Sequence, residues 1–159
     1  MKIYIYGLLL IFTFACTTTK VIHNPSKNNI TGSWKLTNID QPSEDTADEM
    51  PLFDVAIMSC LKGSIWNFNS DKTSGLITMN GTGCLISNRQ IHWLIYEPGD
   101  GTVNFQFKYK AIDQEDQSHS SKGYQTKIDK IDGAVMVMHT KSSKDNLSPT
   151  VLTFTKITP

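Results

Sequence analysis

The chain has 159 residues with 15 basic and 15 acidic side chains, so its formal net charge at pH 7 is zero. Without a basic excess or a basic stripe, nucleic acid is excluded as an expected partner. The length suits one domain with one core. Thr, Ile, Val and aromatic residues are frequent after the first residues, while Ala and Leu are scarce there, which favours strands over helices.

The first sixteen residues have the layout of an export signal. Lys2 precedes an uncharged run from Ile3 to Ala15, which is too short to span a bilayer and is typical of a secretory signal peptide. Cys16 directly follows the small Ala15, and this layout resembles a bacterial lipoprotein signal, in which the thiol carries a diacylglycerol after cleavage. The alternatives are ordinary secretion with an incidental cysteine, or an uncleaved helical anchor.

We therefore predict a signal peptide at residues 1–15, a lipidated Cys16 with a polar tether at 16–29, and a folded domain at 30–159. The expected location is the cell envelope of a Gram-negative bacterium, with the lipid in the outer membrane and the domain periplasmic or surface-exposed. Cys60 and Cys84 remain as a pair in an oxidising compartment, which predicts a disulfide. The alternative is two buried free thiols; no ligand spacing around either cysteine indicates a metal site.

Alternating apolar and polar residues predict eight strands, at 32–39, 64–69, 76–80, 89–96, 102–111, 123–131, 134–140 and 150–157. Between the first two strands, the apolar spacing at 50–61 predicts a short helix, although an irregular segment is the alternative. Turn residues at 70–75 and 97–101 and an Asp132-Gly133 hairpin turn of the favoured two-residue type separate later strands. Polar loops are expected at 40–49, 113–122 and 141–149.

Eight sequential strands with short connections tend to close on themselves, because closure removes exposed edges. The predicted fold class is therefore all-β: an eight-stranded antiparallel up-and-down barrel with at most one short helix between the first two strands. A flattened sandwich is the rival architecture.

Several motifs then resemble a known family. Gly32-Ser33-Trp34-Lys35-Leu36 resembles the Gly-x-Trp signature of lipocalins, with Gly32 and Trp34 as the signature residues. The ordered series of Cys60, Trp66-x-Phe68, Cys84, Arg89-x3-Trp93 and Phe105-Gln106-Phe107-Lys108 is similar to lipocalin-like bacterial lipoproteins. The resemblance implies an exported, lipid-anchored lipocalin-type barrel. Lipocalins often place an Arg over the signature tryptophan after the last strand, and here that end carries Lys156.

No catalytic set is recognisable, so we do not expect an enzyme or a cofactor. The histidines lie in the tether, in a loop or on strands without metal spacing, at His23, His92, His119 and His139. The acidic residues between 40 and 49 lack the order of a calcium loop. No metal site is expected.

Aromatic residues on the inner faces are the better functional indication. They either fill the barrel as core or line an apolar pocket for a small hydrophobic ligand such as a lipid or fatty acid. These predicted ligand-binding residues are Trp66, Phe68, Trp93, Phe105, Phe107 and Tyr124. The alternative is a structural or protein-interaction lipoprotein with a filled barrel, which presents the charged loops 40–50 and 112–122 to an unknown partner.

Overall fold

The computed structural model describes residues 26–41, 52–53, 58–79, 84, 88–111, 122–140 and 149–158. The predicted signal peptide, Cys16 and parts of the predicted loops lie outside these residues. The described elements are α1 (Lys27–Ile30), β1 (Gly32–Asp40), α2 (Met58–Leu61), β2 (Ile65–Phe68), β3 (Ser74–Thr78), β4 (Asn88–Tyr96), β5 (Asn104–Tyr109), β6 (Gly123–Ile131), β7 (Val135–Thr140) and β8 (Val151–Ile157). The last residues of the predicted tether thus belong to α1.

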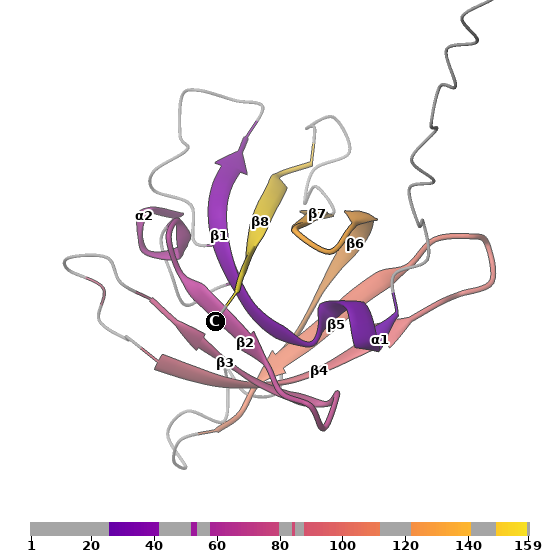
Figure 1. Cartoon of the computed structure of the whole chain (residues 1–159), viewed down its shortest axis with the longest axis horizontal. Coiled ribbons are helices and arrows are strands. Elements are labelled where there is room, and N and C mark those ends of the chain that lie inside the picture. Colours follow the sequence, from indigo (N-terminus) through magenta and orange to yellow (C-terminus); the bar gives the residue numbers. More distant parts are fainter. Residues whose placement is uncertain are drawn as a thin grey trace, which may run out of the picture.

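The eight strands form one closed antiparallel barrel (Figure 1). Each strand pairs with the next in sequence, and β1 pairs with β8 from Ser33–Ile157 to Asp40–Val151, with a bulge between Leu36 and Asn38. The predicted up-and-down barrel is therefore confirmed, and the flattened sandwich is not the architecture. Closure leaves no strand with a free edge, which is the usual hazard of an open sheet.

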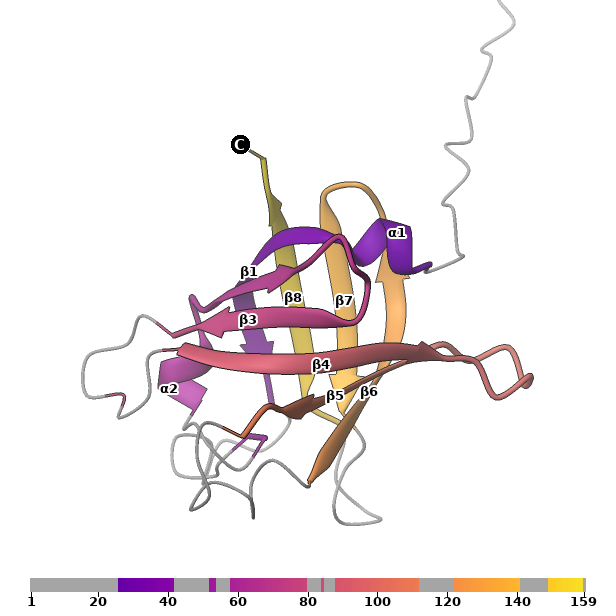
Figure 2. The same cartoon turned by 90° about the horizontal axis from the view of Figure 1, so that it is seen from below.

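The two ends of the barrel differ in how the strands are joined. At one end, called the α1 end, α1 precedes β1 and short turns join β2 to β3 and β6 to β7. At the opposite end, called the α2 end, longer connections join β1 to β2, β3 to β4, β5 to β6 and β7 to β8. Figure 2 shows α1 and α2 at these opposite ends. Among the described residues, no helix has the length and apolar character that crossing a membrane requires.

Strand alternation places one face of each strand in a common apolar core. On β5, Phe105, Phe107 and Tyr109 are buried, and Lys108 between them is exposed. The inner face of β7 is formed by Met136 and Met138, both fully buried. The inward positions expected from the sequence are thus confirmed, because the period of two fixes the whole face once one residue is placed.

Gly75 belongs to a strand and not, as predicted, to a turn. It pairs with Phe68 on β2 and with Ile91 on β4. A Cβ atom at this position would lie 2.6 Å from the backbone oxygen of Asn67 and 3.2 Å from the side chain of Ile91. The absence of a side chain at Gly75 therefore lets β2, β3 and β4 approach closely. For this reason β3 begins at Ser74, within the predicted turn at 70–75.

The predicted helix over 50–61 is wrong in extent. Among the described residues of this range, only those of α2, Met58–Leu61, are helical, and Phe53 has a φ of 60°. A right-handed helix cannot include a residue in the left-handed region, so the apolar spacing around Phe53 has another cause. The predicted irregular alternative holds at this residue, and residues 54–57 lie outside the described part.

The β6–β7 hairpin also differs from its prediction. Neither Asp132 nor Gly133 has a positive φ, which the favoured two-residue turns require. Instead the Asp132 backbone N–H donates to the Val135 carbonyl at 2.9 Å, so Gly133 and Ala134 are the central residues. The Asp132 carboxylate accepts the backbone N–H groups of Ala134 and Val135 at 3.0 and 2.7 Å. The hydrogen bonds of the Asp132 side chain thus stabilise this turn, in which Asp132 and Gly133 have no left-handed backbone conformation.

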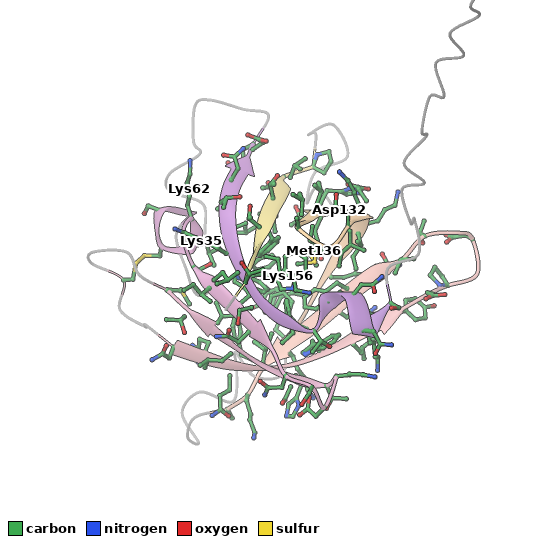
Figure 3. All side chains as sticks on the ribbon, in the orientation of Figure 1. Lys35, Lys62, Asp132, Met136 and Lys156 are labelled. Atoms are coloured by element: carbon green, nitrogen blue, oxygen red, sulfur yellow. A yellow bond between two sulfur atoms is a disulfide. The ribbon has the colours of Figure 1, made fainter. Side chains whose placement is uncertain are left out.

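The predicted disulfide is confirmed. Cys60 in α2 bonds to Cys84, which lies between β3 and β4 (Figure 3). The bond cross-links two neighbouring connections at the α2 end. Because it removes conformations from the unfolded chain, a loop of this size contributes roughly 3 kcal/mol in the chain-entropy model.

The Asp132 turn predicts a specific dependence of stability on pH. The Lys130 side chain, followed by the two backbone donors, lowers the pKa of Asp132 from 3.8 to about 2. A carboxylate with a lowered folded-state pKa stabilises the fold above the unfolded pKa, and this contribution is lost as pH falls from about 4 to about 2. In urea unfolding, wild type should exceed Asp132→Asn in stability at pH 5, and the difference should shrink toward pH 2.

Asp71 has a similarly lowered pKa, from its hydrogen bonds to Ser74 and Thr73, but it is present in both proteins and cancels in the comparison. A difference that stays constant between pH 5 and pH 2 would contradict the assignment.

Candidate functional site

The Gly-x-Trp residues close the α1 end of the barrel. Trp34 is fully buried, and its indole N–H donates to the carbonyl of Ile30 in α1 at 2.6 Å. Gly32 joins α1 to β1 with a φ of 113°, a conformation that side chains rarely adopt. The Lys156 ammonium lies 5.0 Å from the centre of the Trp34 ring. The lysine thus covers the tryptophan from the last strand, at the place where lipocalins often carry an arginine.

All three tryptophans have hydrogen-bonded indole nitrogens within the core. Besides Trp34, the Trp66 N–H donates to the buried Ser64 hydroxyl at 2.9 Å. The Trp93 N–H donates to the Ser74 carbonyl at 2.8 Å. Each of these hydrogen bonds orients its ring, and none of the three indole N–H groups is left without a partner.

Aromatic rings from opposite walls meet inside the barrel. Trp66 on β2 lies 5.5 Å from Phe107 on β5 and 5.4 Å from Phe154 on β8, measured between ring centres. Nearer the α1 end, Phe68 lies 5.3 Å from Trp93 and 5.4 Å from Phe105. At these levels the rings themselves fill the interior.

Phe53 contributes a ring to the core although it does not belong to a strand. It comes from the connection between β1 and α2 and is 7 % exposed. Its ring makes edge-to-face contacts with Phe107, Tyr124 and Trp66, with centre separations of 5.0, 5.5 and 6.2 Å. We call the space that these three rings enclose the Phe53 site. A bulky residue at φ 60° carries a backbone cost of about 1–3 kcal/mol, which the ring contacts offset.

Polar groups gather on the inner wall toward the α2 end. Arg89 on β4 is buried, and its guanidinium lies 5.5 Å from the centre of the Tyr109 ring. Tyr109 in turn lies 5.5 Å from Tyr124, which borders the Phe53 site. The Thr126 hydroxyl lies 3.3 Å from the sulfur of Met138. Buried polar groups therefore stand beside aromatic rings in this part of the interior.

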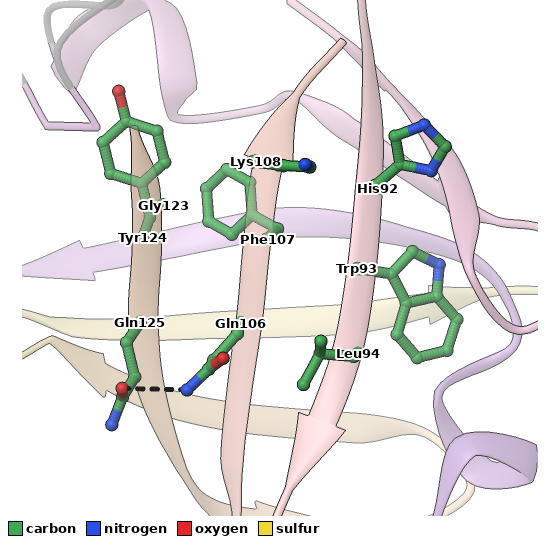
Figure 4. A pocket seen from close by; sticks show the side chains of 9 residues that line it. All are labelled: His92, Trp93, Leu94, Gln106, Phe107, Lys108, Gly123, Tyr124 and Gln125. Atoms are coloured by element: carbon green, nitrogen blue, oxygen red, sulfur yellow. Dashed lines mark hydrogen bonds between the residues drawn. The ribbon is translucent and has the colours of Figure 1, made fainter. Parts of the chain in front are cut away.

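A pocket of about 320 Å³ lies on the β4–β5–β6 wall (Figure 4). Its lining includes outward positions of these strands, at His92, Leu94, Gln106, Lys108, Gly123 and Gln125. Gln106 donates to Gln125 at 3.1 Å across its floor. Because Leu94 and Lys108 are exposed, this hollow belongs to the outer surface of the barrel.

The six predicted ligand-binding residues are all buried and lie in one connected set of rings. Trp66, Phe107 and Tyr124 border the Phe53 site, and Phe68, Trp93 and Phe105 pack beneath them toward the α1 end. Arg89 and Tyr109 were not singled out as site residues, although their alternation with Ile91 and Phe107 places them inward. No sequence signal indicated that Phe53 would enter the barrel.

The two described strand histidines have different surroundings. His92 is exposed on β4. The His139 Nδ1 atom lies 2.6 Å from the Asp129 carboxylate, and Lys127 approaches the other oxygen of that carboxylate at 3.8 Å. Within the described ranges, no group of three or more potential ligands gathers as a metal site would require. His23, His119 and most of the acidic residues between 40 and 49 lie outside those ranges.

No protein-family model matches the chain, and no curated protein matches it. Among solved structures, the chain is similar to a lipocalin-like protein from Bacteroides uniformis, with a TM-score of 0.48 and 10% identity over 81% of this chain and 99% of that chain. The closed meander of eight strands makes this chain lipocalin-like in fold. This is an architecture whose interior is wide enough for side chains or one small ligand.

The lysine over Trp34 predicts a measurable contribution to stability. The variant Lys156→Ala should have a free energy of unfolding lower by about 0.5–1 kcal/mol, because it lacks the half-buried ammonium and its contact with the indole face. Lys156→Arg should retain the stability, since a guanidinium stacks on the same face. Lys35→Ala, at an exposed lysine of the same barrel wall, is the matched control in urea unfolding. Equal effects of the two alanine variants would contradict the contact.

Proposed function

We propose that the protein is a lipid-anchored, non-catalytic binding protein of the cell envelope, whose barrel takes a small hydrophobic ligand at the α2 end. The anchor rests on the sequence of residues 1–16, with Cys16 as the lipidated residue in the outer membrane. The absence of catalysis rests on the lack of a recognisable catalytic set in the sequence. A lipid or fatty acid is the expected class of ligand.

The Phe53 site is the observation that carries the ligand part of this proposal. The α1 end is closed by Ile30, Trp34 and Lys156, so a ligand must enter from the α2 end. There the wall residues Trp66, Phe107 and Tyr124 contact the ring of Phe53, which comes from the connection between β1 and α2. Burying apolar ligand surface against such rings contributes about 25 cal/mol per Å².

A structural or protein-interaction role is the second candidate. The contacts of Trp66 with Phe107 and Phe154 favour it, because rings that meet across the barrel occupy the centre that a long ligand needs. In this case the barrel is a packed scaffold, and the loops at 40–50 and 112–122 contact an envelope protein. Most of these loop residues lie outside the described part of the chain.

The two candidates differ in what copurifies with the chain. For a binding protein, native mass spectrometry after gentle extraction should show a bound small molecule, and added fatty acid should change the tryptophan fluorescence, since Trp66 borders the Phe53 site. Delipidated protein should regain the same mass shift when the extract is returned. Persistently ligand-free protein with unchanged fluorescence, together with a reproducible crosslinked partner, would establish the second candidate instead.

Lipidation is tested independently of the barrel. Mass spectrometry of the membrane-extracted protein should show a mature chain that begins at Cys16 and carries acyl groups. Cys16→Ala should lose the acyl groups, because the thiol that would carry them is removed. Its fold should stay intact, which the thermal unfolding midpoint checks. Cys16→Ala that remains membrane-bound and acylated would contradict the proposal.

A further inference from the structure

The pocket of about 320 Å³ on the β4–β5–β6 wall lies outside the barrel and has no part in the ligand site proposed for the interior (Figure 4). Its volume is at the lower end of the range that small-ligand sites occupy. We call it the outer pocket. The outward residues that line it come from three neighbouring strands and are His92, Leu94, Gln106, Lys108, Gly123 and Gln125.

Gly123 leaves open space at one side of the outer pocket. It lies directly opposite Lys108 in the ladder between β5 and β6. A Cβ atom at this position would meet no other atom within 4 Å, and Gly123 does not have a positive φ. Unlike Gly75, this glycine is therefore required neither by a close approach of strands nor by the backbone conformation. The effect of its missing side chain is the hollow itself.

Lys108 gives the outer pocket a positive charge. Within the described part of the chain, its ammonium group forms no ion pair. His92 lies opposite Lys108 in the ladder between β4 and β5, and both side chains are exposed. An imidazole ring offers an N–H donor, and an ammonium forms charge-assisted hydrogen bonds with a carboxylate. This row of the pocket therefore suits a group with a single negative charge.

The next row of outward residues combines an apolar side chain with oriented amides. Leu94 is 44 % exposed, although the outer face of an antiparallel sheet usually carries polar residues. Opposite Leu94, Gln106 donates to Gln125 at 3.1 Å, and Gln125 donates to Asn104 at 3.1 Å. Each of the two glutamine amides keeps a second N–H donor. The row therefore offers apolar surface and hydrogen-bond donors beside the positive charge.

We propose that the outer pocket is a second ligand site, which binds small carboxylates that have a short apolar body. The carboxylate contacts Lys108 and His92, and the apolar body covers Leu94 in the space beside Gly123. The driving force is the burial of apolar surface that the free protein exposes to water, together with the charge-assisted hydrogen bond. This site is independent of the ligand proposed for the interior, because its lining faces the other side of the same wall.

NMR of the isotope-labelled full chain, titrated with hexanoate, tests the site. The amide resonances of residues 92–94, 106–108 and 123–125 should shift and saturate at roughly millimolar concentrations, because so small a ligand binds weakly. 1-Hexanol lacks the charge, and acetate lacks the apolar chain. At the same resonances, each should bind at least about tenfold more weakly than hexanoate.

Two variants and a matched control assign the contacts. Lys108→Ala should bind hexanoate about tenfold more weakly, because the charge-assisted hydrogen bond is lost. Gly123→Leu should abolish binding by filling the pocket. Its thermal unfolding midpoint should stay near that of wild type, since the added Cβ meets no neighbour. Lys35→Ala removes the same charge from an exposed lysine on β1 and should bind like wild type.

Failure of the outer site and failure of the proposed function give different results. If hexanoate shifts none of these resonances, or binds Lys108→Ala and Gly123→Leu as tightly as wild type, the outer site is overturned. A copurified ligand that Lys108→Ala retains as well as wild type would still support binding in the interior. Saturable shifts that Lys108→Ala weakens and Gly123→Leu abolishes support the outer site.

Discussion

The pairing of β1 with β8 is the constraint on which the rest of the structure depends. It converts a row of hairpins into a closed wall, so that inward residues of all eight strands share one interior. The same register places Trp34 opposite Lys156, which is why the lysine of the last strand covers the tryptophan of the first. An open sheet of this sequence would expose a ladder edge and leave the α1 end uncovered.

Closure also decides what the aromatic residues can do. A barrel of eight strands has little free width, and rings as large as Trp66 and Phe107 reach each other across it. The wall rings pack against one another toward the α1 end, and three of them contact Phe53 toward the α2 end. These wall rings belong to strands, whereas Phe53 comes from a connection.

Much of the barrel could be predicted from the sequence, because side chains of a strand alternate between its two faces, so one buried residue indicates which of its neighbours are also buried. In β6 the inward positions follow from Tyr124 as far as Ile128, where a bulge before Lys130 shifts the alternation and brings Ile131 inward. The disulfide followed from an even cysteine pair, and the place of Lys156 over the tryptophan from the resemblance to lipocalins. Phe53 could not be predicted, because its position depends on contacts between segments that are distant in sequence. The Asp132 turn was misassigned because the dipeptide Asp-Gly permits a left-handed turn without requiring one.

The Cys60–Cys84 bond has a consequence for the chain just before it. Phe53 precedes Cys60 by only a few residues, so the bond ties its connection to the neighbouring one near the barrel rim. Any displacement of one connection is therefore resisted by the other, and a reducing agent would remove this mutual restraint.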